Sequence, residues 1–287
     1  MLTLRTFSLA LSAWMLVVAA SPQTMAQDVT ADQLREALHF HAPFDGTADA
    51  KVAEGDKSIL TAESLARKTL TPGIHREHVT IAASAGRYGD CLHFTGRTDQ
   101  VLCYPGTAMH YSEKDWSGSV SFWMKLTPDT DLPAGYCDPL QITQKAWNDG
   151  AFFVDFDKDL PRDFRLGTFS DLLFWNPENI EWDKWPVEKR PMVTVHKPPF
   201  AKTEWTHVAF TFQNINSADK SPATAILYLN GKSQGELKQP MKFTWEKQQV
   251  VIMLGIEYVG DLDDLMIFRR ALSEKEVQFL ATAKESL

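Results

Sequence analysis

Hydrophobic and polar residues alternate along most of this chain, and turn-forming residues interrupt the alternation at short intervals. Successive side chains of a β-strand point to opposite faces, so a period of two predicts strands with one face toward a core. Within 119–126, for example, Val120, Phe122, Met124 and Leu126 share one face. Short alternating segments separated by turns are typical of an antiparallel β-sandwich.

The segments that follow this pattern are predicted to be strands: 38–44, 90–95, 101–104, 119–126, 151–156, 164–169, 192–197, 205–212, 224–230, 250–255 and 264–269. The pair Asn230-Gly231 tolerates positive φ angles and predicts a two-residue hairpin turn. A mostly β chain of 287 residues fits one sandwich with long loops better than two domains.

Two helices are expected to interrupt the strands. Helical spacing at Leu60 and Leu65 predicts a helix over 58–69. Ser273 and Glu276 form a capping box, which predicts a short C-terminal helix from 274 to about 283.

The N-terminus resembles a secretory signal peptide. The apolar run 7–20 follows a positive charge, and small residues precede a cleavage point after Ala26. The alternative is an uncleaved membrane anchor, but about 14 apolar residues fall short of the ~20 that span a bilayer. We therefore predict a signal peptide (1–26), a lead-in (27–37) and one domain (38–287), with no membrane span after cleavage and a secreted or periplasmic location.

Composition limits the partners. A content of 44% hydrophobic residues is too high for a disordered chain. The formal net charge of −8 provides no basic surface for phosphate groups, which argues against a nucleic-acid partner.

The chain contains three cysteines. Cys91 and Cys103 flank a turn at 96–99, which would place them nearly opposite each other on adjacent strands. The sequence leaves two alternatives, a disulfide or two buried thiols, because nearly opposite hairpin positions often have unsuitable geometry. Cys137 is interpreted as a small buried hydrophobic residue.

Six segments in order resemble the laminin-G-like, concanavalin A-like jelly-roll domains of exported bacterial proteins: 39–49, 86–96, 116–126, 204–212, 227–232 and 260–277. The resemblance implies an all-β, two-sheet jelly roll that often binds glycans or protein, frequently with calcium, and it does not imply catalysis. The link 45–89 is longer than this family's usual connection between its first two strands.

The resemblance also brings the Asp45-Gly46 turn near the last long strand, which contains Asp261 and Asp263. Calcium binds six to eight oxygen ligands, and Asp-rich loops provide them. These three aspartates are therefore candidate ligands of a structural calcium ion. The alternative is that they cap turns and accept hydrogen bonds from backbone amides.

Tryptophans gather in the segment 174–185. Indole rings stack on sugar rings while amides and carboxylates bind the hydroxyls, so aromatic side chains with polar neighbours suit glycan binding. The candidate ligand-binding residues are Trp147, Trp175, Asn176, Glu181, Trp182, Asp183 and Trp185. The alternative is that the tryptophans clamp a long loop onto the sandwich.

Other chemical motifs are weak. His39 and His41 share a strand face, but a zinc site needs further ligands and the neighbouring sequence provides none, so packing is favoured. Asp155 and Asp157 are interpreted as solvated acids at a strand edge. The chain has neither the E-x-D-x-x-E run of glycosidases with this fold nor a G-x-S-x-G nucleophile elbow.

The sequence favours an exported, non-catalytic module that binds a polysaccharide or glycoconjugate. One alternative is a structural or interaction module for a cell-surface protein. The other is a divergent glycoside hydrolase or polysaccharide lyase, which two carboxylates converging in a groove would support.

Overall fold

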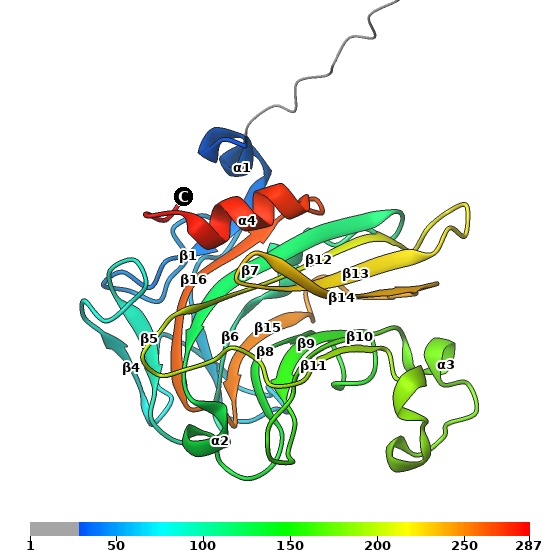
Figure 1. The fold of residues 1–287 in the computed structure, drawn as a ribbon, viewed down its shortest axis with the longest axis horizontal. Coiled ribbons are helices and arrows are strands. Elements are labelled where there is room, and N and C mark those ends of the chain that lie inside the picture. Colours follow the sequence, from blue (N-terminus) through cyan, green and yellow to red (C-terminus); the bar gives the residue numbers. More distant parts are fainter. Residues whose placement is uncertain (1–28) are drawn as a thin grey trace, which may run out of the picture.

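Two eight-stranded antiparallel sheets stack face to face in the computed structural model, which describes residues 29–287 (Figure 1). The predicted signal peptide, 1–26, lies outside the described residues. None of the helices in 29–287 combines the length and the apolar character that crossing a bilayer requires.

The first sheet, called sheet A, has the strand order β14-β13-β12-β7-β16-β5-β4, and β1 also pairs with β16. Its strands are β1 (Leu38–Ala42), β4 (Val79–Ala82), β5 (Cys91–Phe94), β7 (Trp116–Lys125), β12 (Thr206–Ile215), β13 (Ala223–Leu229), β14 (Lys232–Gln239) and β16 (Gly260–Phe268). Asn230 and Gly231 join β13 to β14 with φ angles of 49° and 75°, which confirms the predicted hairpin turn.

The second sheet, called sheet B, has the order β11-β10-β9-β8-β15-β6-β2-β3. Its strands are β2 (Leu60–Ala62), β3 (Leu70–Pro72), β6 (Val101–Pro105), β8 (Cys137–Thr143), β9 (Ala151–Phe156), β10 (Phe164–Phe169), β11 (Met192–Val195) and β15 (Val251–Ile256). Along one edge of the sandwich, β11 of this sheet lies beside β14 of sheet A.

Helices are few and short: α1 (Ala31–Ala37), α2 (Pro128–Asp131), α3 (Leu172–Trp175), α4 (Glu274–Thr282), and the 3-10 helices η1 (Gly106–Met109), η2 (Trp182–Lys184) and η3 (Val187–Lys189). α4 confirms the predicted C-terminal helix, and its Ser273–Glu276 capping box is formed. α1 begins with a second capping box at Thr30 and Gln33.

The main core lies between the sheets and is built by the alternation that the sequence shows. Val120, Phe122 and Met124 of β7 are buried in it, as predicted. All predicted strand segments contain strands, and the all-β sandwich is confirmed. The strands that were not predicted are short or lack clear alternation: β2, β3, β4, β8 and β14.

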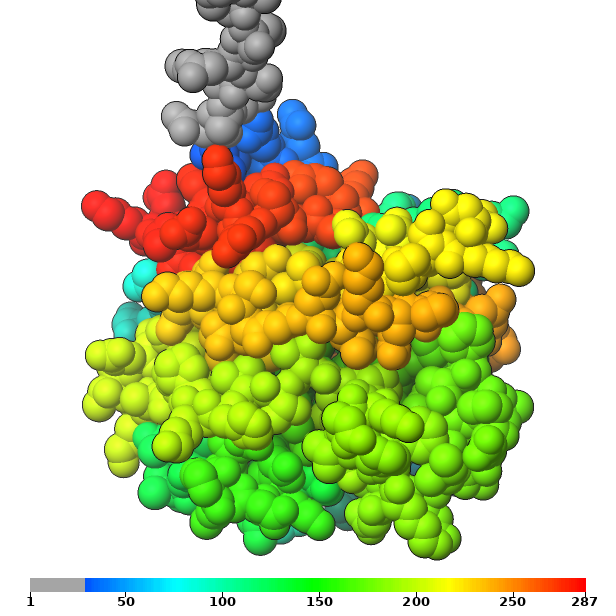
Figure 2. Space-filling model, turned by 45° about the vertical axis from the view of Figure 1, so that its right-hand side comes forward, coloured from blue at the N-terminus to red at the C-terminus, as the bar shows by residue number. Residues whose placement is uncertain are grey.

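Both terminal helices lie on the outer face of sheet A (Figure 1). Leu34 of α1 and Val277 and Leu280 of α4 pack with Ala209 and Met266 in a second buried cluster. Figure 2 shows α4, in red, above the yellow to orange strands β13 and β14. The two helices cover the part of this face that β12, β13 and β16 form, whereas the pocket described below lies on the outer face of sheet B.

The predicted helix over 58–69 is wrong. Those residues begin with β2, which pairs with β6 and with β3, and then turn. Backbone pairing with the edge of sheet B outweighs the local helical spacing. The long link 45–89 therefore extends the edges of the sandwich with strands.

The predicted neighbourhood of Cys91 and Cys103 is also wrong, because β5 belongs to sheet A and β6 to sheet B. Both thiols are free and buried, which is the second of the two alternatives. Cys137 is also free and buried, as interpreted from the sequence. Burial raises the pKa of Cys91 to about 12 and that of Cys103 to about 11, so both are thiols at neutral pH.

Glu276 gives α4 a predictable dependence on pH. Arg270 donates two hydrogen bonds to its carboxylate, at 2.9 and 2.6 Å, and lowers the pKa of Glu276 to about 2. A depressed folded-state pKa stabilises the fold above the ordinary value of 4.5, and this stabilisation is lost as pH falls toward 2. We expect Glu276→Gln to lower Tm at neutral pH and to flatten the fall of Tm between about pH 5 and 2. Glu274→Gln, in the same turn, is the control, and equal Tm profiles for the two variants would contradict the assignment.

Candidate functional site: a pocket on the outer face of sheet B

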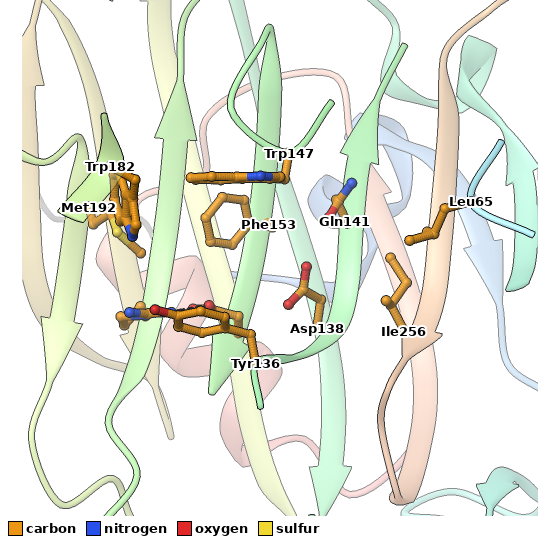
Figure 3. Close-up of a pocket in the computed structure, with 11 residues that line it drawn as sticks. Leu65, Tyr136, Asp138, Gln141, Trp147, Phe153, Trp182, Met192 and Ile256 are labelled. Atoms are coloured by element: carbon orange, nitrogen blue, oxygen red, sulfur yellow. Dashed lines mark hydrogen bonds and ion pairs between the residues drawn. The ribbon is translucent and has the colours of Figure 1, made fainter. Parts of the chain in front are cut away.

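A pocket of about 280 Å³ lies on the outer face of sheet B (Figure 3). We call it the sheet-face pocket. Its apolar lining consists of Leu65, Tyr136, Trp147, Phe153, Trp182, Met192 and Ile256. Its polar lining consists of Asp138, Gln141, Asp155 and Arg165. The strands β8, β9, β10, β11 and β15 form its floor, and Trp147, which follows β8, and Trp182, at the start of η2, form one end.

Strand alternation positions the floor. In β9, Phe152 and Val154 point into the main core, so Phe153 and Asp155 point to the outer face. Phe153 lies opposite Gly167 of β10, and a β-carbon on that glycine would come within 2.3 Å of the phenyl ring. Glycine is therefore needed there to let the ring lie flat across the neighbouring strand.

A bulge in β8 brings two polar side chains to the pocket. The register between β8 and β9 shifts between Cys137 and Leu140, and both of these residues belong to the core. The extra residue lets Asp138 and Gln141 both reach the outer face, which plain alternation would not allow at this spacing.

Two indole rings form the aromatic end. The rings of Trp147 and Trp182 are perpendicular, with centroids 5.1 Å apart, and both contact Phe169. The Arg190 guanidinium lies 4.1 Å from the centroid of the Trp182 ring and holds it in place. Trp147 remains 37% exposed, so its ring is available to a ligand.

A buried ion pair forms the polar end. Arg165 Nε donates to Asp155 Oδ1 at 2.9 Å, Nη2 contacts Oδ2 of the same carboxylate, and Nη1 lies 3.1 Å from Asp157 Oδ2. The Tyr136 ring lies 5.0 Å from the guanidinium. Beside this pair, burial and then the charge of Asp155 raise the pKa of Asp138 well above its usual range. Asp138 therefore keeps its proton to a higher pH than an exposed aspartate does.

The interpretation of Asp155 as a solvated acid at a strand edge is wrong. β9 is an inner strand between β8 and β10, and Asp155 is 3% exposed. A signal was present in the sequence, because Arg165 stands alone among apolar residues in the strand 164–169 and a charge in such a place needs a partner. The sequence analysis did not identify the other polar lining residues, Asp138 and Gln141, because no residue pattern predicts the β-bulge that turns both side chains to the outer face.

The structure brings Trp147 and Trp182 into the pocket and leaves the other predicted tryptophans outside its lining. Trp175 donates its indole N–H to the Asn148 carbonyl at 2.9 Å and packs edge-on against Phe169. Trp185 packs against Trp175 and donates to the Lys189 carbonyl. These two rings clamp the loop, which was the alternative role.

The predicted polar ligands of this loop lie elsewhere. Asn176 is buried and exchanges two hydrogen bonds with Ile180, so its amide holds the loop turn. Glu181 is exposed and pairs with Lys184 at 3.0 Å. Asp183 is exposed and does not line the pocket.

The three aspartates predicted to bind calcium are engaged by protein donors. Asp45 accepts from the Asp90 amide at 2.9 Å, and Asp263 accepts from the amides of Arg87 and Tyr88. Asp261 pairs with His93 and with Lys125. These contacts fit the alternative role in turns and ion pairs, and calcium binding stays a prediction from the sequence.

A serine, a histidine and an aspartate also meet beneath the C-terminus. His41 Nε2 lies 2.7 Å from Asp264 Oδ1 and 3.2 Å from Ser286 Oγ, which itself donates to Asp264 at 2.6 Å. A catalytic triad needs the aspartate on the ring nitrogen away from the serine. Here His41 Nδ1 has no partner, so the group is a structural hydrogen-bond network.

Comparison with known proteins bears on this site. Residues 95–278 match the family model described as the concanavalin A-like lectin/glucanases superfamily. No curated protein matches the chain.

Solved structures share the fold at low identity. Domain 4 of an extracellular arabinanase from Geobacillus stearothermophilus, in complex with arabinotriose, is 19% identical with a TM-score of 0.52, over 85% of this chain and 98% of that one. The binding domain of Paraclostridial Mosquitocidal Protein 1 is 16% identical with a TM-score of 0.51, over 87% and 52%. A structure of botulinum neurotoxin type C is 12% identical with a TM-score of 0.51, over 89% of this chain and 53% of that one. It is described under the statement that cell entry of this toxin depends on interaction with two ganglioside molecules.

Proposed function

The chain belongs to the concanavalin A-like lectin/glucanases superfamily, and we propose that it is an exported, non-catalytic module that binds a polysaccharide or glycoconjugate in the sheet-face pocket. Its predicted signal peptide supports export to the periplasm or beyond. The observation that carries the proposal is the pair of indole rings, Trp147 and Trp182, beside a row of hydrogen-bonding side chains.

The chemistry of the pocket suits a sugar. The C–H face of a pyranose or furanose ring stacks on an indole, and its hydroxyls need donors and acceptors nearby. Gln141 offers both, Asp138 offers a carboxyl group, and the Arg165–Asp155 pair adds fixed charges at the far end. The similarity to structures described with arabinotriose and with gangliosides supports the same ligand class.

Titration calorimetry against a panel that includes arabino-oligosaccharides and ganglioside headgroups tests the proposal. We expect Trp147→Ala to weaken binding of the responding glycan by about 2 kcal/mol, or roughly 30-fold, because a central aromatic contact dominates such interfaces. Trp205→Ala is the matched control, because this half-buried indole packs under Lys125 of sheet A, away from the pocket. Parallel titrations with calcium and with a chelator test the predicted ion.

An equal loss in both tryptophan variants would place the glycan elsewhere. No heat from any glycan would favour the protein-interaction alternative, for which Leu173, Phe174 and Val187 provide exposed apolar contacts.

Glycoside cleavage is the second candidate, because two carboxylates do converge in the pocket. Asp138 has a raised pKa, which is the direction that a general acid requires, and Asp155 is its neighbour on β9. Against this role, both oxygens of Asp155 are occupied by Arg165, which weakens a nucleophile. Release of reducing sugar by the unmodified chain, abolished in Asp138→Asn with binding retained, would establish cleavage; binding without release would exclude it.

A further inference from the structure

A group of two histidines and one glutamate lies apart from the sheet-face pocket. The ligand atoms of His39, Glu54 and His110 all lie within 4.8 Å of one another. His39 Nε2 is 3.6 Å from a Glu54 carboxylate oxygen, and the His39 and His110 ring centroids are 4.8 Å apart. The three side chains come from β1, from the link after it, and from the residue that ends η1.

The buried nitrogen of this group has no partner. His39 is 5% exposed, and its Nε2 makes no hydrogen bond. A neutral imidazole carries its N–H on one ring nitrogen and a lone pair on the other, so Nε2 can bind a metal ion when the proton lies on Nδ1.

The neighbouring histidine of the same strand shows the contrast. His41 Nε2 is already paired with Asp264 at 2.7 Å. The unpaired Nε2 of His39 instead lies near a carboxylate and a second imidazole, and an ion bound between the three side chains would give it a partner.

His110 occupies a costly backbone conformation. Its φ and ψ are 46° and 41°, in the left-handed region that non-glycine residues seldom adopt. Asparagine or glycine would fit this turn with less strain, whereas the histidine places an imidazole beside His39.

We propose that His39, Glu54 and His110 bind a divalent transition-metal ion of the zinc class. Two imidazoles and one carboxylate are a donor set that zinc accepts, and three protein ligands leave a fourth position for water. Calcium does not suit the site, because it prefers six to eight oxygen ligands. The sequence had provided no further ligand for His39, and the fold provides two from distant segments.

Zinc titration of the full chain tests the proposal, with calorimetry and Tm as readouts. We expect saturable binding of one Zn²⁺ per chain and a Tm that rises with its concentration, since a ligand of the native state stabilises it. Glu54→Gln and His110→Asn should each weaken Zn²⁺ binding by about tenfold or more. Loss of a residue that only hydrogen-bonds to a metal ligand already lowers metal affinity by about this factor, and here a ligand itself is lost. Asparagine tolerates the left-handed turn, and Glu54 is exposed, so both variants should fold.

His196→Asn is the matched control. His196 is an exposed histidine that also lies beside a carboxylate, Asp163, at 2.9 Å, but it belongs to no group of three candidate ligands among residues 29–287. Its variant should bind Zn²⁺ as the unmodified chain does. Absence of Zn²⁺ binding, or equal binding by the Glu54→Gln and His196→Asn variants with circular dichroism showing both folded, would overturn the proposal.

Discussion

Replacing Arg165 with methionine is expected to lower the free energy of unfolding by about 3–5 kcal/mol, the usual cost of removing one partner of a buried ion pair. The substitution keeps the length of the side chain but leaves the Asp155 carboxylate, 3% exposed, without its guanidinium. It also takes the positive charge away from Asp157 and from the pocket. Urea unfolding followed by tryptophan fluorescence measures the loss.

A second variant separates the charge from the packing. Asp155→Leu together with Arg165→Met replaces the whole pair with apolar side chains, and such replacements are often neutral. We expect the double variant to recover most of the stability that the single variant loses. A single variant within about 1 kcal/mol of the unmodified chain would show that the pair is screened like a surface salt bridge.

Trp116→Ala is expected to destabilise the fold by a similar amount, about 3–5 kcal/mol, through loss of buried area and creation of a cavity. Trp116 is 1% exposed and lies at the start of β7. Its ring packs edge-on against Tyr111, Phe212 and Trp245, and its N–H donates to the Met109 carbonyl at 3.2 Å. Alanine therefore removes the centre of an aromatic cluster and leaves a buried carbonyl unpaired.

Trp185→Ala provides the comparison for the same change of side chain. Trp185 is half-buried in a loop and donates to a carbonyl four residues away. We expect a much smaller effect on unfolding, measured by calorimetry. Equal losses for the two variants would mean that the loop unfolds with the core and stabilises it as strongly as the aromatic cluster does.

The strands could be predicted because the alternation of side chains is a local property of the sequence. β9 and β10 have the predicted bounds, 151–156 and 164–169. β2 could not be predicted in this way, because it is a strand only through its pairing with β6. The helix expected at 58–69 fails for the same reason: a nonlocal backbone partner outweighs the helical spacing.

Two of the tryptophans that the sequence proposes as ligand contacts, Trp147 and Trp182, line the sheet-face pocket. The clustering of tryptophans in the sequence does not show which rings line a pocket and which pack inside the loop. Both Trp175 and Trp182 contact the Phe169 ring, but Trp182 lines the pocket whereas Trp175 holds the loop in place. The Arg165–Asp155 pair depends on cross-strand register, and the His39 group on segments far apart in sequence. Contacts between residues that are far apart in sequence follow from the tertiary fold, and no local sequence pattern predicts them.

The packing of α1 and α4 on the same outer face has a practical consequence. Figure 1 shows α1, α4 and the C-terminus on the same side of the molecule. They pack on sheet A, whereas the sheet-face pocket lies on the outer face of sheet B, the other sheet of the sandwich. A bead, membrane or fused domain attached through α1 or through the C-terminus would therefore lie on the sheet A side of the molecule. The outer face of sheet B, with its pocket, would then point away from the attachment and remain accessible to the solvent.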